Sequence, residues 1–201
     1  MKRIGVLSVQ GAFHEHINML RRTGVHPVPV RLPMDIKGLD GLVIPGGEST
    51  AITKLIRDFK LEESLLKLIS NGAPVLGTCA GMIVLAKRID GNNRGPLAVI
   101  DIEVKRNAFG RQVDSFEMDL DVPVIGPPLF HAIFIRAPVI ERVGANVEII
   151  AKLPGDEIVA CREGNIVCTS FHPELTSDLR FHDYFLNLNQ DSISIDTASV
   201  R

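Results

Sequence analysis

The sequence predicts an α/β fold in a single domain, with a mostly parallel central sheet flanked by helices and antiparallel hairpins in the C-terminal half. Up to Gly95, short apolar runs alternate with segments of helical periodicity, which is typical of a parallel sheet covered by helices on both faces. Beyond Gly95 the apolar runs are short and alternating, as hairpin strands are. The length of 201 residues suits one domain, and no repeat or linker divides the chain.

The first elements are strands separated by one helix. Residues Ile4 to Val9 form a continuous apolar run and predict a buried strand. Apolar residues then recur with helical spacing from Phe13 to Leu20, and the helix they predict ends near Gly24. Two more short strands are predicted at residues 25–32 and 39–44.

A long helical stretch follows. It begins at Ser49, a good N-cap residue, and apolar residues recur every three or four positions as far as Ile69. An Asn-Gly pair at residues 71–72 ends it. A fourth strand is predicted from Pro74 to Leu76, and a further helix from Met82 to Ala86.

The C-terminal half contains the expected hairpins. Strands are predicted at residues 97–104, 115–120, 132–135, 147–153, 157–162 and 166–171. The tight-turn residues Gly164 and Asn165 place Cys161 opposite Cys168 on a hydrogen-bonded rung, where paired backbones are about 5.5 Å apart. Because the total of three cysteines is odd, we expect both to be free core thiols rather than a disulfide.

The chain ends in a predicted helix from Ser177 to Leu188 and a polar tail. The predicted organisation is therefore one domain over residues 1–188 and a C-terminal tail over residues 189–201.

Composition and charge argue against several classes of function. Lys and Arg number 22 against 24 Asp and Glu, so the net charge is −2, with no excess to attract nucleic acid. The apolar stretch from Val122 to Ile140 is broken by prolines, His131 and Arg136, which excludes it as a membrane helix. The N-terminal apolar run is too short for a signal peptide. We expect a cytoplasmic protein with neither a membrane nor a nucleic acid as partner.

A candidate nucleophile lies between the fourth strand and the next helix. Residues 77–81 read Gly-Thr-Cys-Ala-Gly, the pattern of a nucleophile elbow with Cys79 in the place of serine. The side chain at the tip of so sharp a turn needs strained backbone angles, and glycines two residues away let strand and helix approach closely. The helix N-terminus also favours the thiolate. The alternative interpretation is an inert, buried cysteine beside packing glycines.

His172 is the candidate general base, and Glu174 the residue that orients it. They lie two residues apart in an extended segment that Pro173 keeps out of a helix, so their side chains point the same way. A carboxylate there can orient the imidazole and stabilise its charged form. The alternative interpretation is a surface turn in which a histidine and a glutamate occur together by chance, which is common for a His-Pro-Glu sequence alone.

Backbone donors for an oxyanion are expected at two turns. Residues 45–49 read Pro-Gly-Gly-Glu-Ser between a strand and a helix, so the Gly47 N–H can face a cleft at low steric cost. The second donor is the N–H of Ala80. Both lie at the carboxyl ends of predicted parallel strands, where open α/β sheets bind ligands.

Together these motifs resemble the class I, or triad, glutamine amidotransferase family. Within that class, the chain is similar to the glutaminase subunits of pyridoxal 5'-phosphate synthase. The segments that carry this closer resemblance are 8–16 (SVQGAFHEH), 45–50 (PGGEST), 77–82 (GTCAGM), 106–117 (RNAFGRQVDSFE), 134–138 (FIRAP) and 171–176 (FHPELT). They cover the chain up to about Leu188. The resemblance implies a flavodoxin-like, three-layer arrangement.

The resemblance also implies a role for each matched residue. Cys79 would be the thiolate, His172 the base and Glu174 its orienting carboxylate, and these would hydrolyse L-glutamine to L-glutamate and ammonia. The residues implied to bind glutamine are Gly46, Gly47, Glu48, Arg106, Ile135 and Arg136. A free α-carboxylate suits the guanidinium groups of the two arginines, although the residues alone would not single them out.

The partner implied is the synthase subunit of pyridoxal 5'-phosphate synthase, in a hetero-oligomeric complex. That subunit would receive the ammonia for vitamin B6 synthesis, with Gln10 and the helix after it at the docking surface. No cofactor and no metal are implied. His14 and His16 have no partner pair at zinc-like spacing, and we expect them on the polar surface of their helix.

Three alternatives remain at this point. The glutaminase could serve another synthase, for example in histidine biosynthesis. The chain could be a cysteine hydrolase or chaperone of the related α/β superfamily, although those lack a His-Pro-Glu after the last strand. It could also be a catalytically silent binding subunit, whose mark would be a broken triad.

Overall fold

The computed structural model describes residues 1–91, 93–106, 108 and 115–191. The strands are, in chain order, β1 (Arg3–Leu7), β2 (His26–Val30), β3 (Gly41–Ile44), β4 (Val75–Thr78), β5 (Ala86–Ile89), β6 (Asn93–Arg94), β7 (Ile100–Lys105), β8 (Ser115–Leu120), β9 (Phe130–Ile135), β10 (Val139–Val143), β11 (Glu148–Lys152), β12 (Ile158–Glu163) and β13 (Ile166–Thr169). The helices are α1 (Phe13–Arg22), α2 (Ser49–Asp58), α3 (Glu62–Ser70), α4 (Ala80–Leu85) and α5 (Arg180–Asp191), with 3₁₀ helices η1 (Pro33–Ile36), η2 (Pro123–Ile125) and η3 (Pro173–Leu175).

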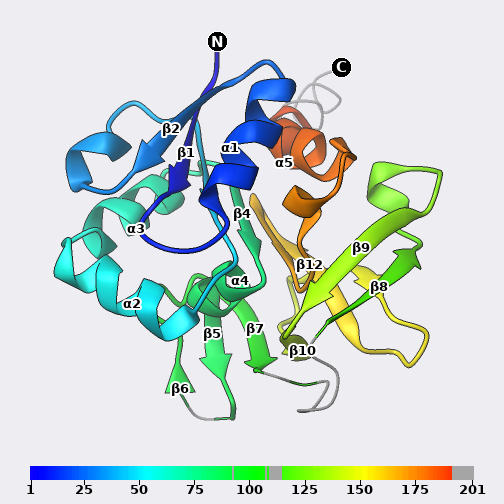
Figure 1. Ribbon diagram of the computed structural model, residues 1–201. Helices are drawn as coiled ribbons and strands as arrows, with labels where there is room; N and C mark the ends of the chain where they lie inside the picture. Colours follow the sequence, from blue (N-terminus) through cyan, green and yellow to red (C-terminus); the bar gives the residue numbers. More distant parts are fainter. Residues whose placement is uncertain (92, 107, 109–114, 192–201) are drawn as a thin grey trace, which may run out of the picture.

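The main sheet has the order β2-β1-β3-β4-β13-β12-β10-β7-β5-β6, with β11 paired to β12. The five strands from β2 to β13 are parallel, and the pairs β13–β12, β12–β10 and β10–β7 are antiparallel. A separate antiparallel hairpin, β8–β9, stands beside the segment that leads into α5 (Figure 1). These pairings confirm the predicted parallel centre and the C-terminal hairpins.

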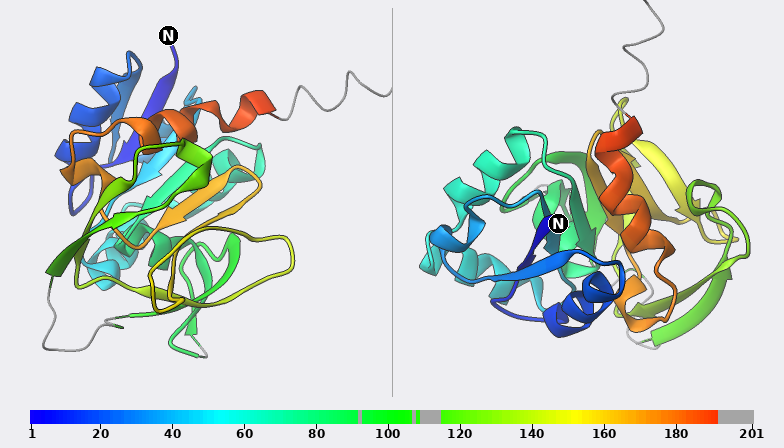
Figure 2. Two further views of the ribbon diagram at one scale, coloured as in Figure 1. Left: turned by 90° about the vertical axis from the view of Figure 1, so that its right-hand side faces the viewer. Right: turned by 90° about the horizontal axis from the view of Figure 1, so that it is seen from above.

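Helices cover both faces of the central strands, as predicted. In β3, Leu42 and Ile44 enter the core formed with α2, α3 and α4, whereas Val43 enters the core formed with α1, α5 and β9. The alternation follows from the strand pleat, which points successive side chains to opposite faces. The view from above in Figure 2 shows α2 and α3 on one side of these strands and α1 and α5 on the other. No helix in the described part of the chain is long and apolar enough to cross a membrane.

The long helical stretch predicted from Ser49 to Ile69 is two helices. α2 ends at Asp58 with Phe59 as its C-cap residue, and the next residue, Lys60, has a φ of 55°. The N–H of Leu61 then bonds the carbonyl of Ile56, and the N–H of Lys60 bonds that of Arg57, which is a Schellman motif. Leu61 is fully buried and holds the break in place. The prediction was wrong because lysine occupies the position where glycine would have signalled the end.

Other boundaries differ from the prediction in detail. β5, β6 and β10 had no predicted counterpart, and β5 begins at Ala86, where the backbone leaves the helical conformation. β7 starts at Ile100 instead of Leu97. α5 starts at Arg180 instead of Ser177, because the Asp178 carboxylate accepts the Arg180 N–H at 2.9 Å. α5 runs to Asp191, and the rest of the predicted tail, residues 192–201, lies outside the described residues.

The predicted pairing of Cys161 with Cys168 is confirmed. They face each other across β12 and β13, and both are free and fully buried. Gly164, in the turn, has a φ of 57°, which a side chain would oppose. Burial, together with the hydrogen bond to Cys161, raises the pKa of Cys168 well above its usual value, so this sulfur stays a thiol.

Two glycines, Gly77 in β4 and Gly81 in α4, allow the helix to pack closely against the sheet. A Cβ on Gly81 would lie 1.9 Å from the carbonyl oxygen of Ile44, and one on Gly77 would lie 2.5 Å from Cδ1 of Leu85. No side chain fits at such distances. The close approach of strand and helix therefore requires both glycines.

We expect Gly81→Ala to lower the free energy of unfolding by about 2–4 kcal/mol, because the new Cβ would overlap backbone that cannot move freely. Urea unfolding followed by circular dichroism measures the change. Gly91→Ala is the matched control: a Cβ there meets nothing within 4 Å, and only its φ of 87° opposes the substitution. That strain should cost about 1–2 kcal/mol. An equal decrease in the free energy of unfolding in the two variants would contradict the steric explanation.

Candidate active site

Cys79 occupies a strained turn between β4 and α4. Its φ of 49° and ψ of −105° lie outside the regions favoured by residues with a side chain. The backbone is held there because the Cys79 N–H donates to the carbonyl of Thr169 at 2.8 Å. The thiol points toward β9, with Sγ 3.9 Å from the carbonyl oxygen of Ile135. The turn has the strained backbone geometry that the sequence predicts for a nucleophile elbow.

His172 and Glu174 lie after β13, the strand beside β4. The imidazole Nδ1 is 2.7 Å from Oε1 of Glu174, and both side chains are buried. The His172 N–H donates to the carbonyl of Ile133 in β9 at 2.9 Å, which fixes the backbone of the segment. A Cβ on Gly46 would lie 2.4 Å from Cε1 of His172 and 3.3 Å from Cβ of Cys79. The structure thus places the three predicted triad residues together, with glycine required at position 46.

The charges of this group are coupled. Burial alone would lower the pKa of His172, but its hydrogen bonds to Cys79 and Glu174 and their charges raise it to about 10. Burial would raise the pKa of Glu174, yet its electrostatic interactions with His16 and His172 and its hydrogen bond to His172 lower it. At neutral pH the pair is therefore an imidazolium and a carboxylate. Such an imidazolium can give a proton to a leaving group.

Two more histidines lie behind Glu174, and sequence reasoning missed both. His16 was expected on the surface of α1, but it is fully buried, with Nε2 3.3 Å from Oε2 of Glu174 and 3.1 Å from Oγ1 of Thr78. Its Nδ1 lies 3.0 Å from Nε2 of His182 in α5. The signal was present in the spacing, because position 16 is three residues after Phe13 and lies on the apolar face of the helix.

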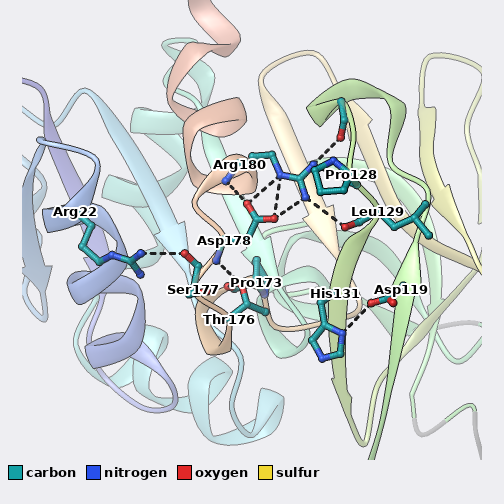
Figure 3. Close-up of polar contacts among 11 residues, drawn as sticks. Arg22, Asp119, Pro128, Leu129, His131, Pro173, Thr176, Ser177, Asp178 and Arg180 are labelled. Carbon is teal, nitrogen blue, oxygen red and sulfur yellow. Dashed lines mark hydrogen bonds and ion pairs between the residues drawn. The ribbon is translucent and has the colours of Figure 1, made fainter.

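The segment that contains His172 and Glu174 is fixed on two sides (Figure 3). Arg22 of α1 donates to the carbonyl of Ser177 at 2.9 Å. Arg180 pairs with Asp178 at 2.6 Å and donates to the carbonyl of Pro128 at 2.7 Å in the loop before β9. The turn between η3 and α5 is thereby tied both to α1 and to the hairpin β8–β9.

A pocket of about 400 Å³ opens above Cys79. The predicted site residues that line it are Gln10, Gly46, Gly47, Glu48, Cys79, Ala80, Arg106, Ile135, Arg136 and His172. Glu174 is buried behind His172 and does not reach the pocket. The pocket lies at the carboxyl ends of the parallel strands, where the sequence places it.

Arg106 reaches this pocket with the help of a residue that sequence reasoning did not identify. Asp90, which has a φ of 48°, accepts from Nε of Arg106 at 2.7 Å and from its backbone N–H at 3.0 Å. The ion pair with Asp90 involves Nε of Arg106 and not the two terminal nitrogens of its guanidinium group. Most of the segment after Arg106 on which the family resemblance rests, residues 107 and 109–114, lies outside the described residues.

Glu48 and Gln10 are tied to backbone at the pocket wall. The Glu48 carboxylate caps α2, accepting from the N–H groups of Thr50 and Ala51 at 3.0 and 2.7 Å. Hydrogen bonds from Thr50 lower the pKa of Glu48. Gln10 accepts the Glu48 N–H through Oε1 at 2.8 Å, and this oxygen would lie 2.4 Å from a Cβ on Gly47. Gln10 therefore touches the turn that contains a predicted oxyanion donor.

Arg136 and Ile135 complete the wall opposite Gly46. Arg136 follows β9 directly and has a φ of 42°, so the chain turns sharply at the pocket. Ile135 is 38% exposed there, a large fraction for an isoleucine. Among the described residues, no three His, Cys, Asp or Glu side chains form a group that could hold a metal ion.

Comparison with known proteins gives consistent matches. A model of the SNO glutamine amidotransferase family matches residues 6–190. The chain is 54% identical over 191 residues to the pyridoxal 5'-phosphate synthase subunit PdxT of Dehalococcoides mccartyi, covering 94% of this chain and 98% of that one. It is 53% identical over 186 residues to PdxT of Moorella thermoacetica, covering 92% and 98%. A crystal structure of a glutamine amidotransferase matches with a TM-score of 0.86 and 49% identity, covering 92% and 97%.

We expect the imidazole of His172 to stay protonated through neutral pH and to lose its proton only near its pKa of about 10. NMR of labelled histidine ring nitrogens measures this titration directly. In the Glu174→Gln variant the pKa should fall, because the carboxylate that stabilises the imidazolium is gone. Titration of His172 near 6.5 in the unsubstituted protein would contradict the arrangement.

Proposed function

The chain belongs to the SNO glutamine amidotransferase family, and we propose that Cys79, His172 and Glu174 form the triad with which it hydrolyses L-glutamine. It is a glutaminase that makes L-glutamate and ammonia for pyridoxal 5'-phosphate (vitamin B6) synthesis. The observation that supports the triad best is the buried His172–Glu174 pair, with its 2.7 Å contact, beneath the strained turn of Cys79.

The first half of the reaction forms a thioester. The Cys79 thiolate attacks the side-chain amide carbon of glutamine, and the carbonyl electrons move to its oxygen. When this tetrahedral intermediate collapses, the C–N bond breaks and the His172 imidazolium gives its proton to the departing nitrogen, which leaves as ammonia. The raised pKa of His172 ensures that this proton is present at neutral pH.

The second half releases glutamate. Neutral His172 takes a proton from water, the resulting nucleophile attacks the thioester carbon, and the C–S bond breaks to restore the thiolate. Glu174 stabilises the imidazolium that forms again. The N–H groups of Gly47 and Ala80, which both line the pocket, would stabilise the oxyanion in each half.

Glutamine would lie along the pocket wall formed by Gly46 to Glu48, Arg106, Ile135 and Arg136. Because the Glu48 carboxylate is bound to its own helix, this residue would contact the substrate through its backbone. The guanidinium of Arg106, oriented by Asp90, and that of Arg136 suit the α-carboxylate.

The protein works with a synthase partner. We infer that this partner is the synthase subunit that receives the ammonia, and that it docks at Gln10 and the exposed face of α1. Gln10 supports this placement, since its contact with the Glu48 N–H connects a surface loop to the Gly47 turn. We also infer that the complex acts in the cytoplasm, where thiols stay reduced.

The first experiment measures glutamate release from glutamine with and without purified pyridoxal 5'-phosphate synthase subunit. Release that rises sharply with the synthase is the expected result. Strong glutamate release that does not depend on the synthase would indicate that the protein serves another pathway. No glutamate release under either condition would contradict the glutaminase reaction.

Cys79→Ala should reduce glutamine hydrolysis by about 10⁴-fold or more, because the thiol supplies the nucleophile and almost no core volume. Glutamate release in the presence of the synthase measures this. Cys161→Ala is the matched control, since that sulfur is buried outside the pocket, and it should retain full activity. Retained turnover in Cys79→Ala would contradict the mechanism.

Arg106→Ala should raise KM for glutamine by about 10- to 100-fold with a smaller change in kcat, because a hydrogen-bonded charge pair with the substrate is lost. Steady-state kinetics separate the two parameters. Arg31→Ala removes an exposed guanidinium that does not line the pocket and should change neither. An unchanged KM in Arg106→Ala would exclude Arg106 from substrate binding.

A further inference from the structure

We propose that His16 is a positioning residue for the reaction, which holds the Glu174 carboxylate through its Nε2–H and so keeps His172 directed at Cys79. His182 supports it by fixing the tautomer of His16. This inference rests on the proposed triad, but it concerns two residues that contact neither the substrate nor the thiol.

Glu174 has one oxygen that the triad does not use. Oε1 receives the bond from His172, whereas Oε2 is buried and has no hydrogen bond of ordinary geometry among the described residues. His16 Nε2 lies 3.3 Å from it. A buried carboxylate oxygen without a donor is costly, and catalytic hydrogen bonds are often long before substrate binds. His16 is therefore placed to supply the donor that Oε2 lacks.

The hydrogen bond between His16 and His182 favours the tautomer of His16 that has its proton on Nε2, the atom that faces Glu174. If His16 has its proton on Nε2, its Nδ1 accepts from Nε2–H of His182, 3.0 Å away, and Nδ1 of His182 is a bare acceptor. If His16 has its proton on Nδ1, the Nδ1–H of His182 becomes a buried donor. This His182 atom has no partner among the described residues. An orphaned buried N–H is rarer than an orphaned acceptor, so the first arrangement is favoured.

Thr78 is compatible with the same arrangement. Its Oγ1 accepts the Gly46 N–H at 3.0 Å and lies 3.1 Å from Nε2 of His16. The proton on His16 can thus be shared between Thr78 and Glu174. His16 therefore contacts the carboxylate that orients His172 directly, and it is linked through Thr78 to Gly46, which lies against the His172 ring.

The proposed arrangement requires the imidazole rings of His16 and His182 to be neutral. Burial lowers the pKa of His16, as does the charge of His172, while Glu174 and Glu15 oppose this shift. Burial also lowers the pKa of His182 to about 3, with smaller effects of His16, Glu174 and Arg22. A neutral His16 donates to Glu174 without adding a positive charge. The carboxylate charge therefore remains available to the His172 imidazolium.

The test compares four variants. His16→Leu removes the donor at similar volume, whereas His16→Gln keeps an N–H near the position of Nε2. Ile17→Ala is the matched control, because it perturbs the packing of the same helix without touching the hydrogen-bond chain. Circular dichroism and thermal unfolding establish that each variant folds, and His182→Phe provides a second route if His16→Leu does not.

Two readouts are used. The first is kcat and KM for glutamine in the complete complex with the synthase. The second is the rate at which iodoacetamide alkylates Cys79 in the isolated chain as a function of pH, which reports how well the His172 imidazolium stabilises the thiolate. Cys161 and Cys168 are fully buried, so the reagent reports on Cys79. The alkylation readout needs no turnover and therefore tests the inference even if the protein does not hydrolyse glutamine.

His16→Leu should lower kcat by about 10- to 100-fold with KM nearly unchanged, the size expected for one lost hydrogen bond to a charged group. The pH midpoint of alkylation should move upward. His182→Phe should do the same to a smaller extent, and His16→Gln should restore most of the activity. An unchanged alkylation profile in His16→Leu, or an equal loss of kcat in Ile17→Ala, would overturn the proposal.

Discussion

The ion pair between His172 and Glu174 is the interaction on which the rest of the site depends. Both charges are buried, and a buried charge is tolerated only where its partner and its remaining lone pairs are satisfied. The surrounding structure reflects this demand. β9 binds the backbone of His172, Gly46 leaves room for its ring, and two neutral histidines lie behind the carboxylate. These groups fix the positions of the two side chains whose charges compensate each other.

The fold could largely be predicted because its strands obey one simple rule. β1, β3, β4 and β13 are buried on both faces and read as continuous apolar runs, which local sequence reveals directly. The break at Lys60 could not be read in this way, since a left-handed lysine is stabilised by the burial of Leu61 rather than by its own preference. The edge strand β6 and its neighbour β5 are short and charged, so hydrophobic periodicity does not reveal them.

The residues of the candidate site also fall into those that the local sequence reveals and those that it does not. The proposed triad of Cys79, His172 and Glu174 could be predicted, because these residues lie in turns whose residue types are typical of such a site and the glycine spacing around Cys79 matches a nucleophile elbow. Arg106 and Arg136 could be predicted only from the family resemblance, because no feature of the local sequence distinguishes an arginine that binds a substrate from one that is solvated. His16 and Asp90 act through contacts between segments far apart in the sequence. Such contacts exist only in the folded chain. The residues next to His16 and Asp90 in the sequence therefore give no sign of them.

The position of β13 has a consequence for how the protein is made. This strand is synthesised last among the described strands, yet it inserts between β4 and β12 in the middle of the sheet. While the chain is still emerging from the ribosome, β4 would present an unpaired, apolar edge next to Cys79, open to wrong pairing with other chains. The same order ensures that Cys79 meets its histidine last. A half-made chain therefore contains the sulfur but not the histidine of the proposed triad, and under that proposal it would liberate no ammonia before the strand is in place.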